Sequence, residues 1–103
     1  MIYDINNYTL CRNQWTKKER EEALTLQGPI LIVGASGFIG ANFFFNLINL
    51  RQDVYAASRS VDTTWRFNQL PQEVKNHNLV TLDIIDEGKT RSILNRLKPR
   101  TVF

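Results

Sequence analysis

The residues best suited to chemistry in this chain are three glycines in one short turn, Gly34, Gly37 and Gly40. The turn follows the apolar run 30–33 and leads into the apolar segment 41–48, which predicts a strand, a glycine turn and a helix in that order. A Cβ atom would obstruct a tight turn at Gly34, the close approach of a phosphate at Gly37 and helix packing at Gly40. The helix start also presents N–H groups without intrahelical partners, so the pattern predicts a site for a dinucleotide's diphosphate.

The spacing of these glycines, Gly-x-x-Gly-x-x-Gly, is one residue wider than the Gly-x-Gly-x-x-Gly fingerprint, and a glycine pattern alone is weak evidence. Context strengthens it. A second predicted strand at 53–58 begins about a dozen residues after Gly40, which leaves room for one helix and closes a strand–helix–strand unit. The alternative is an ordinary strand-to-helix turn in which glycine serves geometry alone.

The segments around the turn show the periodicity of a helix packed on a buried sheet. The strand at 30–33 is apolar at every position, which is typical of a central strand covered on both faces. The helix after the turn is predicted over 38–50, with an apolar stripe that faces inward. The members of this stripe are Ile39, Phe43, Leu47 and Leu50, widened by Phe44 and Ile48.

Further elements follow toward the end of the chain. A third strand is predicted at 79–83, and a helix over 86–97, whose first residue, an aspartate, is its expected cap. The segment 60–78 suggests a short helix that a proline interrupts. A fourth strand would start at 101–103 with an open edge, so we expect either a longer protein or self-association as a homo-oligomer.

Residues 1–29 form an extension of polar and charged composition before the first strand. Thr16 and Glu19 match a capping box, and a helix is predicted over 17–26, ended by a Gly-Pro pair. Its apolar stripe is poor, so we expect it to pack loosely on the domain or on a partner. The chain therefore divides into this extension and an incomplete dinucleotide-binding domain, 30–103.

The composition indicates a packed domain rather than a nucleic-acid-binding chain. Apolar residues make up 43% of the 103 residues, and the formal charge of +3 comes from 13 basic and 10 acidic side chains spread along the sequence. A mild concentration of basic residues is more simply a solvated helix face than a surface for nucleic acid. Its members are Lys89, Arg91, Arg96, Lys98 and Arg100.

Cysteine and histidine usage predicts neither a disulfide nor a metal site. Cys11 is the only cysteine, and neither it nor the single histidine, His77, stands at metal-ligand spacing. A reducing compartment is the default for such a chain. No segment resembles a signal peptide or approaches the roughly 18 apolar residues that span a bilayer, so we expect no membrane association and a cytoplasmic location.

Four landmarks of the sequence, taken in order, point to a known family. They are the run 34–40, the pair Ser58-Arg59 at the end of the second strand, 82–86 after the third, and 98–103 leading into the fourth. Together they resemble the extended short-chain dehydrogenase/reductase family, the NAD(P)-dependent epimerases and dehydratases that act largely on nucleotide sugars. The resemblance covers residues 30–103. It implies an α/β fold, a partial Rossmann-type, doubly wound parallel sheet of three to four strands, here with an N-terminal helical extension.

The resemblance also implies roles for individual residues. Backbone N–H groups around the glycine turn would surround the pyrophosphate, and Asp83 would accept a hydrogen bond from the adenine amino group beside the Ile84 backbone. For Asp83 the alternative is a residue that only ends its strand in a turn. The residues implied at the turn are Gly34, Ser36, Gly37, Phe38, Ile39 and Gly40.

The sequence departs from the family pattern at the end of the second strand. Many relatives carry there an acidic residue that binds the ribose hydroxyls of NAD, whereas this chain has Ser58 followed by Arg59. Serine and a guanidinium can receive a 2′-phosphate through charge-assisted hydrogen bonds. One such bond contributes about 1.5–3 kcal/mol, so Arg59 would favour NADP by roughly ten- to a hundred-fold, with NAD still possible. The alternative is that Arg59 is a solvated strand-end residue.

A second departure is Arg51, which stands where the family usually has a glycine between the first helix and the second strand. A left-handed backbone there would cost on the order of 1 kcal/mol relative to glycine.

The family's catalytic Tyr-x-x-x-Lys pair is absent from these residues, because Tyr3, Tyr8 and Tyr55 are followed four positions later by Asn7, Arg12 and Arg59. We therefore expect the amino-terminal, NAD(P)-binding part of an oxidoreductase, epimerase or dehydratase, with no catalytic residue of its own. The alternative is a non-catalytic module for cofactor binding or protein interaction.

Overall fold

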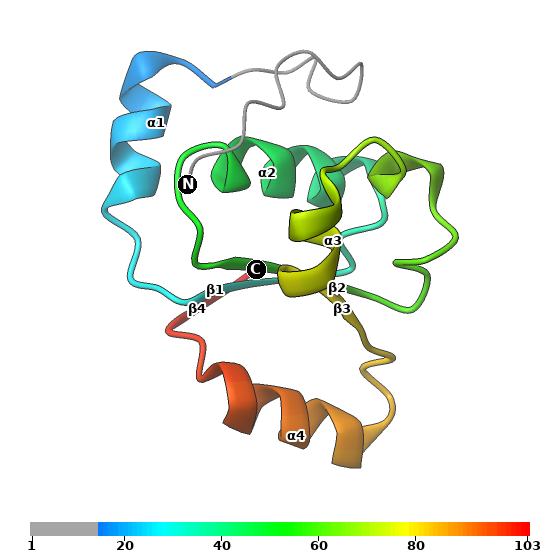
Figure 1. The fold of residues 1–103 in the computed structure, drawn as a ribbon. Helices are drawn as coiled ribbons and strands as arrows, with labels where there is room; N and C mark the ends of the chain where they lie inside the picture. The colour runs from blue at the N-terminus through cyan, green and yellow to red at the C-terminus, as the bar shows by residue number, and fades with distance from the viewer. Residues whose placement is uncertain (1–14) are drawn as a thin grey trace.

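The described residues, 15–103, form a four-stranded parallel sheet with helices on both faces in a computed structural model of the chain (Figure 1). β1 (Ile30–Val33) lies between β2 (Val54–Ser58) and β4 (Thr101–Val102), and β3 (Leu79–Thr81) pairs with the other edge of β2. The resulting order, β3-β2-β1-β4, is that of the first four strands of a Rossmann sheet. The expected fold class is confirmed. Tyr3, Tyr8 and Cys11, on which parts of the sequence interpretation rest, lie outside the described residues.

The central strand β1 is buried on both of its faces, as its unbroken apolar sequence predicts. Ile30 and Ile32 belong to the larger hydrophobic cluster, whereas Leu31, between them, belongs to a second cluster. Successive side chains of a strand point to opposite faces, so the two clusters lie on opposite faces of the sheet. Both neighbours of β1 pair with it in register, since Ile30 lies beside Val54 on one side and Thr101 on the other.

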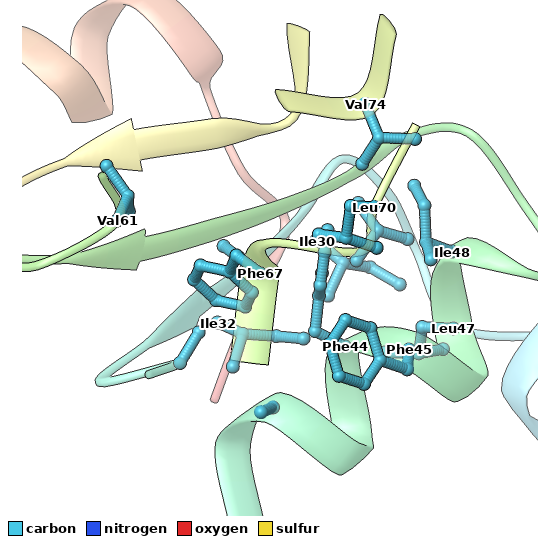
Figure 2. Close-up of a cluster of buried hydrophobic side chains, with 14 of the residues drawn as sticks. Ile30, Ile32, Phe44, Phe45, Leu47, Ile48, Val61, Phe67, Leu70 and Val74 are labelled. Carbon is cyan, nitrogen blue, oxygen red and sulfur yellow. The ribbon is translucent and has the colours of Figure 1, made fainter. Parts of the chain in front are cut away.

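The larger cluster lies beneath α2 (Phe38–Ile48) and α3 (Gln72–His77), which cover one face of the sheet (Figure 1). Three phenylalanine rings fill it, with centroids 6.0–6.1 Å apart (Figure 2). They are Phe44 and Phe45 of α2 and Phe67 of the 3-10 helix η1 (Trp65–Phe67). On the opposite face, α4 (Glu87–Leu97) contributes Ile93 to the smaller cluster. Phe44 and Phe45 are therefore core residues, whereas Phe38, at the start of α2, is exposed.

Helix α2 differs from the expected helix in its length and in the face that it buries. It ends at Ile48 rather than at residue 50, and Ile39, expected in the inward stripe, is 81% exposed. Ile39 belongs to the first turn of the helix, at the edge of the sheet where the strands end, so little of the sheet lies beneath it. The segment 60–78 also resolves into two short helices, because Pro71 ends the first stretch and stands at the N-cap of α3.

Two helix caps appear where the sequence places them. In α1 (Lys17–Leu24), the Thr16 hydroxyl accepts from the Glu19 N–H at 3.2 Å and the Glu19 carboxylate accepts from the Thr16 N–H at 3.0 Å. The bond from the Thr16 N–H to the carboxylate is the main reason that the pKa of Glu19 lies below its usual value. The helix ends two residues before the expected position, where the hydroxyl of Thr25 donates to the Glu22 carbonyl. In α4 the Asp86 carboxylate accepts from the Lys89 N–H at 3.0 Å.

Arg51 joins α1 to the sheet, and it causes no backbone strain. Its backbone is not left-handed, since Lys98 is the one non-glycine residue with positive φ in the described part of the chain. The guanidinium donates to both carboxylate oxygens of Asp53, at 2.6 and 2.7 Å, and to the carbonyls of Ala23 and Leu26 at 3.1 and 2.7 Å. These bonds compensate for the weak apolar stripe of α1.

Within residues 15–103, no helix combines the length and the apolar character that crossing a membrane would need.

The link through Arg51 predicts how stability depends on pH. The Arg51 guanidinium holds the pKa of Asp53 below its ordinary 3.8. A lowered folded-state pKa stabilises the fold above about pH 4, and this contribution is lost as the pH falls through the lowered value. We expect Asp53→Asn to cost about 1 kcal/mol of unfolding free energy near neutral pH, because the partly exposed carboxylate is screened by solvent.

Urea unfolding followed by circular dichroism measures this difference, with Asp62→Asn at an exposed position as the control. The difference in unfolding free energy between wild type and Asp53→Asn should become smaller below about pH 3. A gap that stays constant with pH would contradict the assigned ion pair.

Candidate functional site

A cleft of about 390 Å³ opens where β1, β2 and β3 end. Carboxyl ends of parallel strands are where open α/β sheets bind ligands. Six of the ten residues expected in the cofactor site line this cleft. They are Gly34, Ser36, Ser58, Arg59, Asp83 and Ile84. The other four, Gly37, Phe38, Ile39 and Gly40, form the N-cap and first turn of α2.

The geometry of the glycine turn matches what the sequence predicts at Gly34 and Gly40. Gly34 has a φ of +70°, a conformation that other residues rarely adopt. A Cβ on Gly40 would lie 2.7 Å from the Gly34 carbonyl oxygen and 2.9 Å from the Ala35 Cα, so the helix can approach the turn only without a side chain there. The Ala35 N–H donates to the Ala57 carbonyl at 3.1 Å, which anchors the turn to β2.

Gly37 differs from the other two glycines because the space beside it is open. The nearest atom to a Cβ placed there is the Gly34 carbonyl oxygen at 3.7 Å, an ordinary contact distance. Packing within the protein therefore does not require glycine at this position. Glycine at position 37 instead leaves the backbone accessible from outside.

The start of α2 has no acceptor supplied by its own cap. Its N-cap is Gly37, which has no side chain to accept a hydrogen bond, and its first turn contains no acidic residue. The N–H groups of the first turn of a helix find no intrahelical acceptor and carry a partial positive charge. This end of α2 is therefore suited to a bound anion.

Hydroxyl groups connect the glycine turn to the end of β2. The Ser58 hydroxyl donates to the Ser36 hydroxyl at 2.8 Å and accepts from the Ser60 N–H at 3.2 Å. Ser58 is only 6% exposed, so these bonds fix its orientation at the wall of the cleft. Arg59, by contrast, is exposed and brings a cation to the same wall.

The segment after β3 forms the opposite wall of the cleft. An Asp83 carboxylate oxygen accepts from the Ile85 N–H at 3.1 Å, and the Asp83 carbonyl accepts from the Asp86 N–H at 3.0 Å. Asp83 thus forms a turn directly after β3, as the alternative role of a strand-ending turn residue predicts. Its role toward adenine stays a prediction. Ile84 and Ile85 are both exposed and add an apolar edge to the cleft.

Two features of the site were missed from the sequence. The serine pair Ser36 and Ser58 is 22 residues apart in the chain, and no local pattern indicates that their hydroxyls meet. Arg66, from η1, donates from Nη1 to the Ser36 carbonyl at 3.2 Å. The apolar periodicity of the stretch around Arg66 carries no information about which distant segment its side chain contacts.

Neither a catalytic pair nor a metal site is found in the described part of the chain. Tyr55, the tyrosine within residues 15–103, is half-buried in β2 and precedes Arg59, not a lysine, by four positions. Over the same residues, no group of three or more His, Cys, Asp or Glu side chains could hold a metal ion.

The strand order and the glycine turn after β1 are those of a partial Rossmann-type domain. The sequence matches the family model described as GDP-mannose 4,6 dehydratase over residues 31–103, and the chain belongs to this family of NAD(P)-dependent epimerases and dehydratases. No curated protein and no solved structure matched the chain significantly. The family uses a nicotinamide dinucleotide, which confirms the expected class of cofactor.

The different roles of Gly40 and Gly37 lead to a stability prediction. Alanine at position 40 would press a Cβ against the Gly34 carbonyl, a backbone atom that cannot simply move aside. We expect Gly40→Ala to lower the free energy of unfolding by about 1–3 kcal/mol. Gly37→Ala meets open space and should cost less than about 1 kcal/mol, mostly through the poorer helix cap.

Thermal unfolding of the two variants and the wild type measures this contrast. Equal destabilisation by both substitutions would show that Gly40 is not the point of close packing.

Proposed function

We infer that this chain binds NADP in the cleft, in preference to NAD, as the cofactor-binding part of a reductase, epimerase or dehydratase acting on a nucleotide sugar. The observation that carries this proposal is the uncapped start of α2, which opens beside a cleft lined by the ends of three parallel strands. Membership of an NAD(P)-dependent family supports it.

The diphosphate would lie against the glycine turn. Backbone N–H groups of Ser36, Phe38 and Ile39 would donate to its oxygens, and the open side of Gly37 lets the phosphates approach the chain. Neither Phe38 nor Ile39 covers the turn with a buried side chain, because both are exposed.

The adenosine half would extend from the turn toward β2 and β3, since these strands follow β1 in the sheet. Ser58 and Arg59 at the end of β2 would bind the 2′-phosphate, the serine as a fixed hydroxyl and the arginine as an exposed cation. Asp83 and the Ile84 backbone would lie beside the adenine. The nicotinamide half would lie on the β4 side of the turn.

The chemical step itself is not assigned to these residues. The family pattern places it on a tyrosine and a lysine four positions apart, a pair that these 103 residues do not contain. The function proposed for the chain is therefore cofactor binding, with the nucleotide sugar as the substrate class of the activity that it serves.

Titration calorimetry with NADP and NAD tests the proposal, and Arg59→Asp tests the assigned preference. The substitution replaces the cation with a carboxylate that repels a 2′-phosphate. We expect a loss of NADP affinity of about ten- to a hundred-fold, while NAD affinity stays the same or rises.

The control is Arg96→Asp, which makes the same change of charge at an exposed position on α4. An unchanged ratio of NADP to NAD affinity in Arg59→Asp would remove the preference for NADP. If the wild-type chain bound neither dinucleotide, the proposed function itself would be wrong.

A further inference from the structure

Arg66 connects two segments that the proposed site uses, although it belongs to no sequence motif. It lies in η1, between β2 and α3, and its Nη1 donates to the main-chain carbonyl of Ser36 at 3.2 Å. The donor and the acceptor are 30 residues apart in the chain. The bond therefore ties the loop after β2 directly to the glycine turn.

The acceptor of this bond belongs to the peptide unit that leads into α2. The Ser36 carbonyl and the Gly37 N–H share one planar peptide group, so a bond that fixes the carbonyl also fixes the direction of the N–H. The Gly37 N–H is otherwise held only by the Gly34 carbonyl at 3.4 Å, a long hydrogen bond. Ser58 holds the Ser36 side chain in addition, so residue 36 is fixed through both its backbone and its hydroxyl.

The guanidinium of Arg66 is itself restrained before any ligand arrives. Its central carbon lies 4.7 Å from the centroid of the Trp65 ring, which is a cation–π contact. Trp65 is 61% exposed, so its ring does not belong to the hydrophobic core and is free to pack against the Arg66 guanidinium. A side chain that is already held loses less conformational freedom when a ligand binds.

We propose that Arg66 is a positioning residue for the diphosphate of the cofactor. It fixes the Ser36–Gly37 peptide that leads into α2, so that the N–H groups of the first turn that follows are held facing the phosphate oxygens. This proposal rests on the proposed function, because it assigns Arg66 to the same site. Its action differs from that of Arg59, since it concerns every ligand with a diphosphate, with or without a 2′-phosphate.

Two fragments of the cofactor separate these actions in titration calorimetry of the full chain. ADP-ribose carries the diphosphate without a 2′-phosphate, and adenosine 2′-monophosphate carries a 2′-phosphate without any phosphate at the 5′ position. We expect Arg66→Ala to weaken the binding of ADP-ribose by about ten-fold and that of adenosine 2′-monophosphate by less than about three-fold. Arg66→Lys should recover part of the loss, because an ammonium can still donate to the Ser36 carbonyl. The control Arg96→Ala removes a distant exposed arginine and should change neither affinity.

A second measurement detects the positioning without any ligand. In Arg66→Ala the amide resonance of Gly37 should shift and its hydrogen exchange should accelerate, with Arg66→Lys intermediate and Arg96→Ala unchanged. A Gly37 amide that is the same in Arg66→Ala and wild type would overturn the proposal.

The two proposals also fail in different ways. Binding of ADP-ribose by the wild type with no loss in Arg66→Ala, or a loss confined to adenosine 2′-monophosphate, would overturn the role of Arg66 alone. If the wild type bound neither fragment, the proposed function would fail and the diphosphate role of Arg66 with it.

Discussion

Helix α2 begins so close to the end of β1 that no side chain fits between them at Gly40, where a Cβ would lie 2.7 Å from the Gly34 carbonyl oxygen. This contact fixes where the helix starts and the direction in which the N–H groups of its first turn point. The uncapped N–H groups consequently face the edge of the sheet at which β1, β2 and β3 end. A bulkier turn would move the helix away from the strand and separate the amide groups from the cleft. The proposed site therefore depends on this single close approach.

The rest of the fold makes the turn rigid. Parallel strands flank β1 on both sides, and a hydrophobic cluster covers each of its faces, so the strand that leads into the turn has little freedom to move. The loops at the end of the sheet then carry the polar groups, as in other domains that place binding residues on loops over a packed scaffold. The hydroxyl pair Ser36–Ser58 and the bond from Arg66 extend this rigidity to the loops themselves.

The sequence predicted what local patterns determine. The glycine turn, the apolar central strand, the capping box of Thr16 and the cap at Asp86 each depend on residues within a few positions of one another, and each appears as expected. The parallel order of the strands followed from the alternation of strands and helices, since crossover connections favour that arrangement.

Features that depend on distant residues were not predicted. Arg51 stands where the family usually has a glycine, and its bonds to the carbonyls of Ala23 and Leu26 exist only because the end of α1 lies beside the loop that precedes β2. The exposure of Ile39 depends on where the sheet ends beneath α2, which periodicity within the helix does not reveal. The contacts that surround Ser36 likewise join segments that tertiary structure alone brings together.

The central claim is that the glycine turn between β1 and α2 binds the diphosphate of a nicotinamide dinucleotide. Amide chemical-shift mapping of the ¹⁵N-labelled chain during titration with NADP tests it most directly. The account predicts that the largest shifts occur at residues 34–40, with further shifts at 58–60 and 83–85, and that the outer face of α4 stays unchanged. Shifts centred elsewhere, or a spectrum that NADP leaves unaltered, would contradict it.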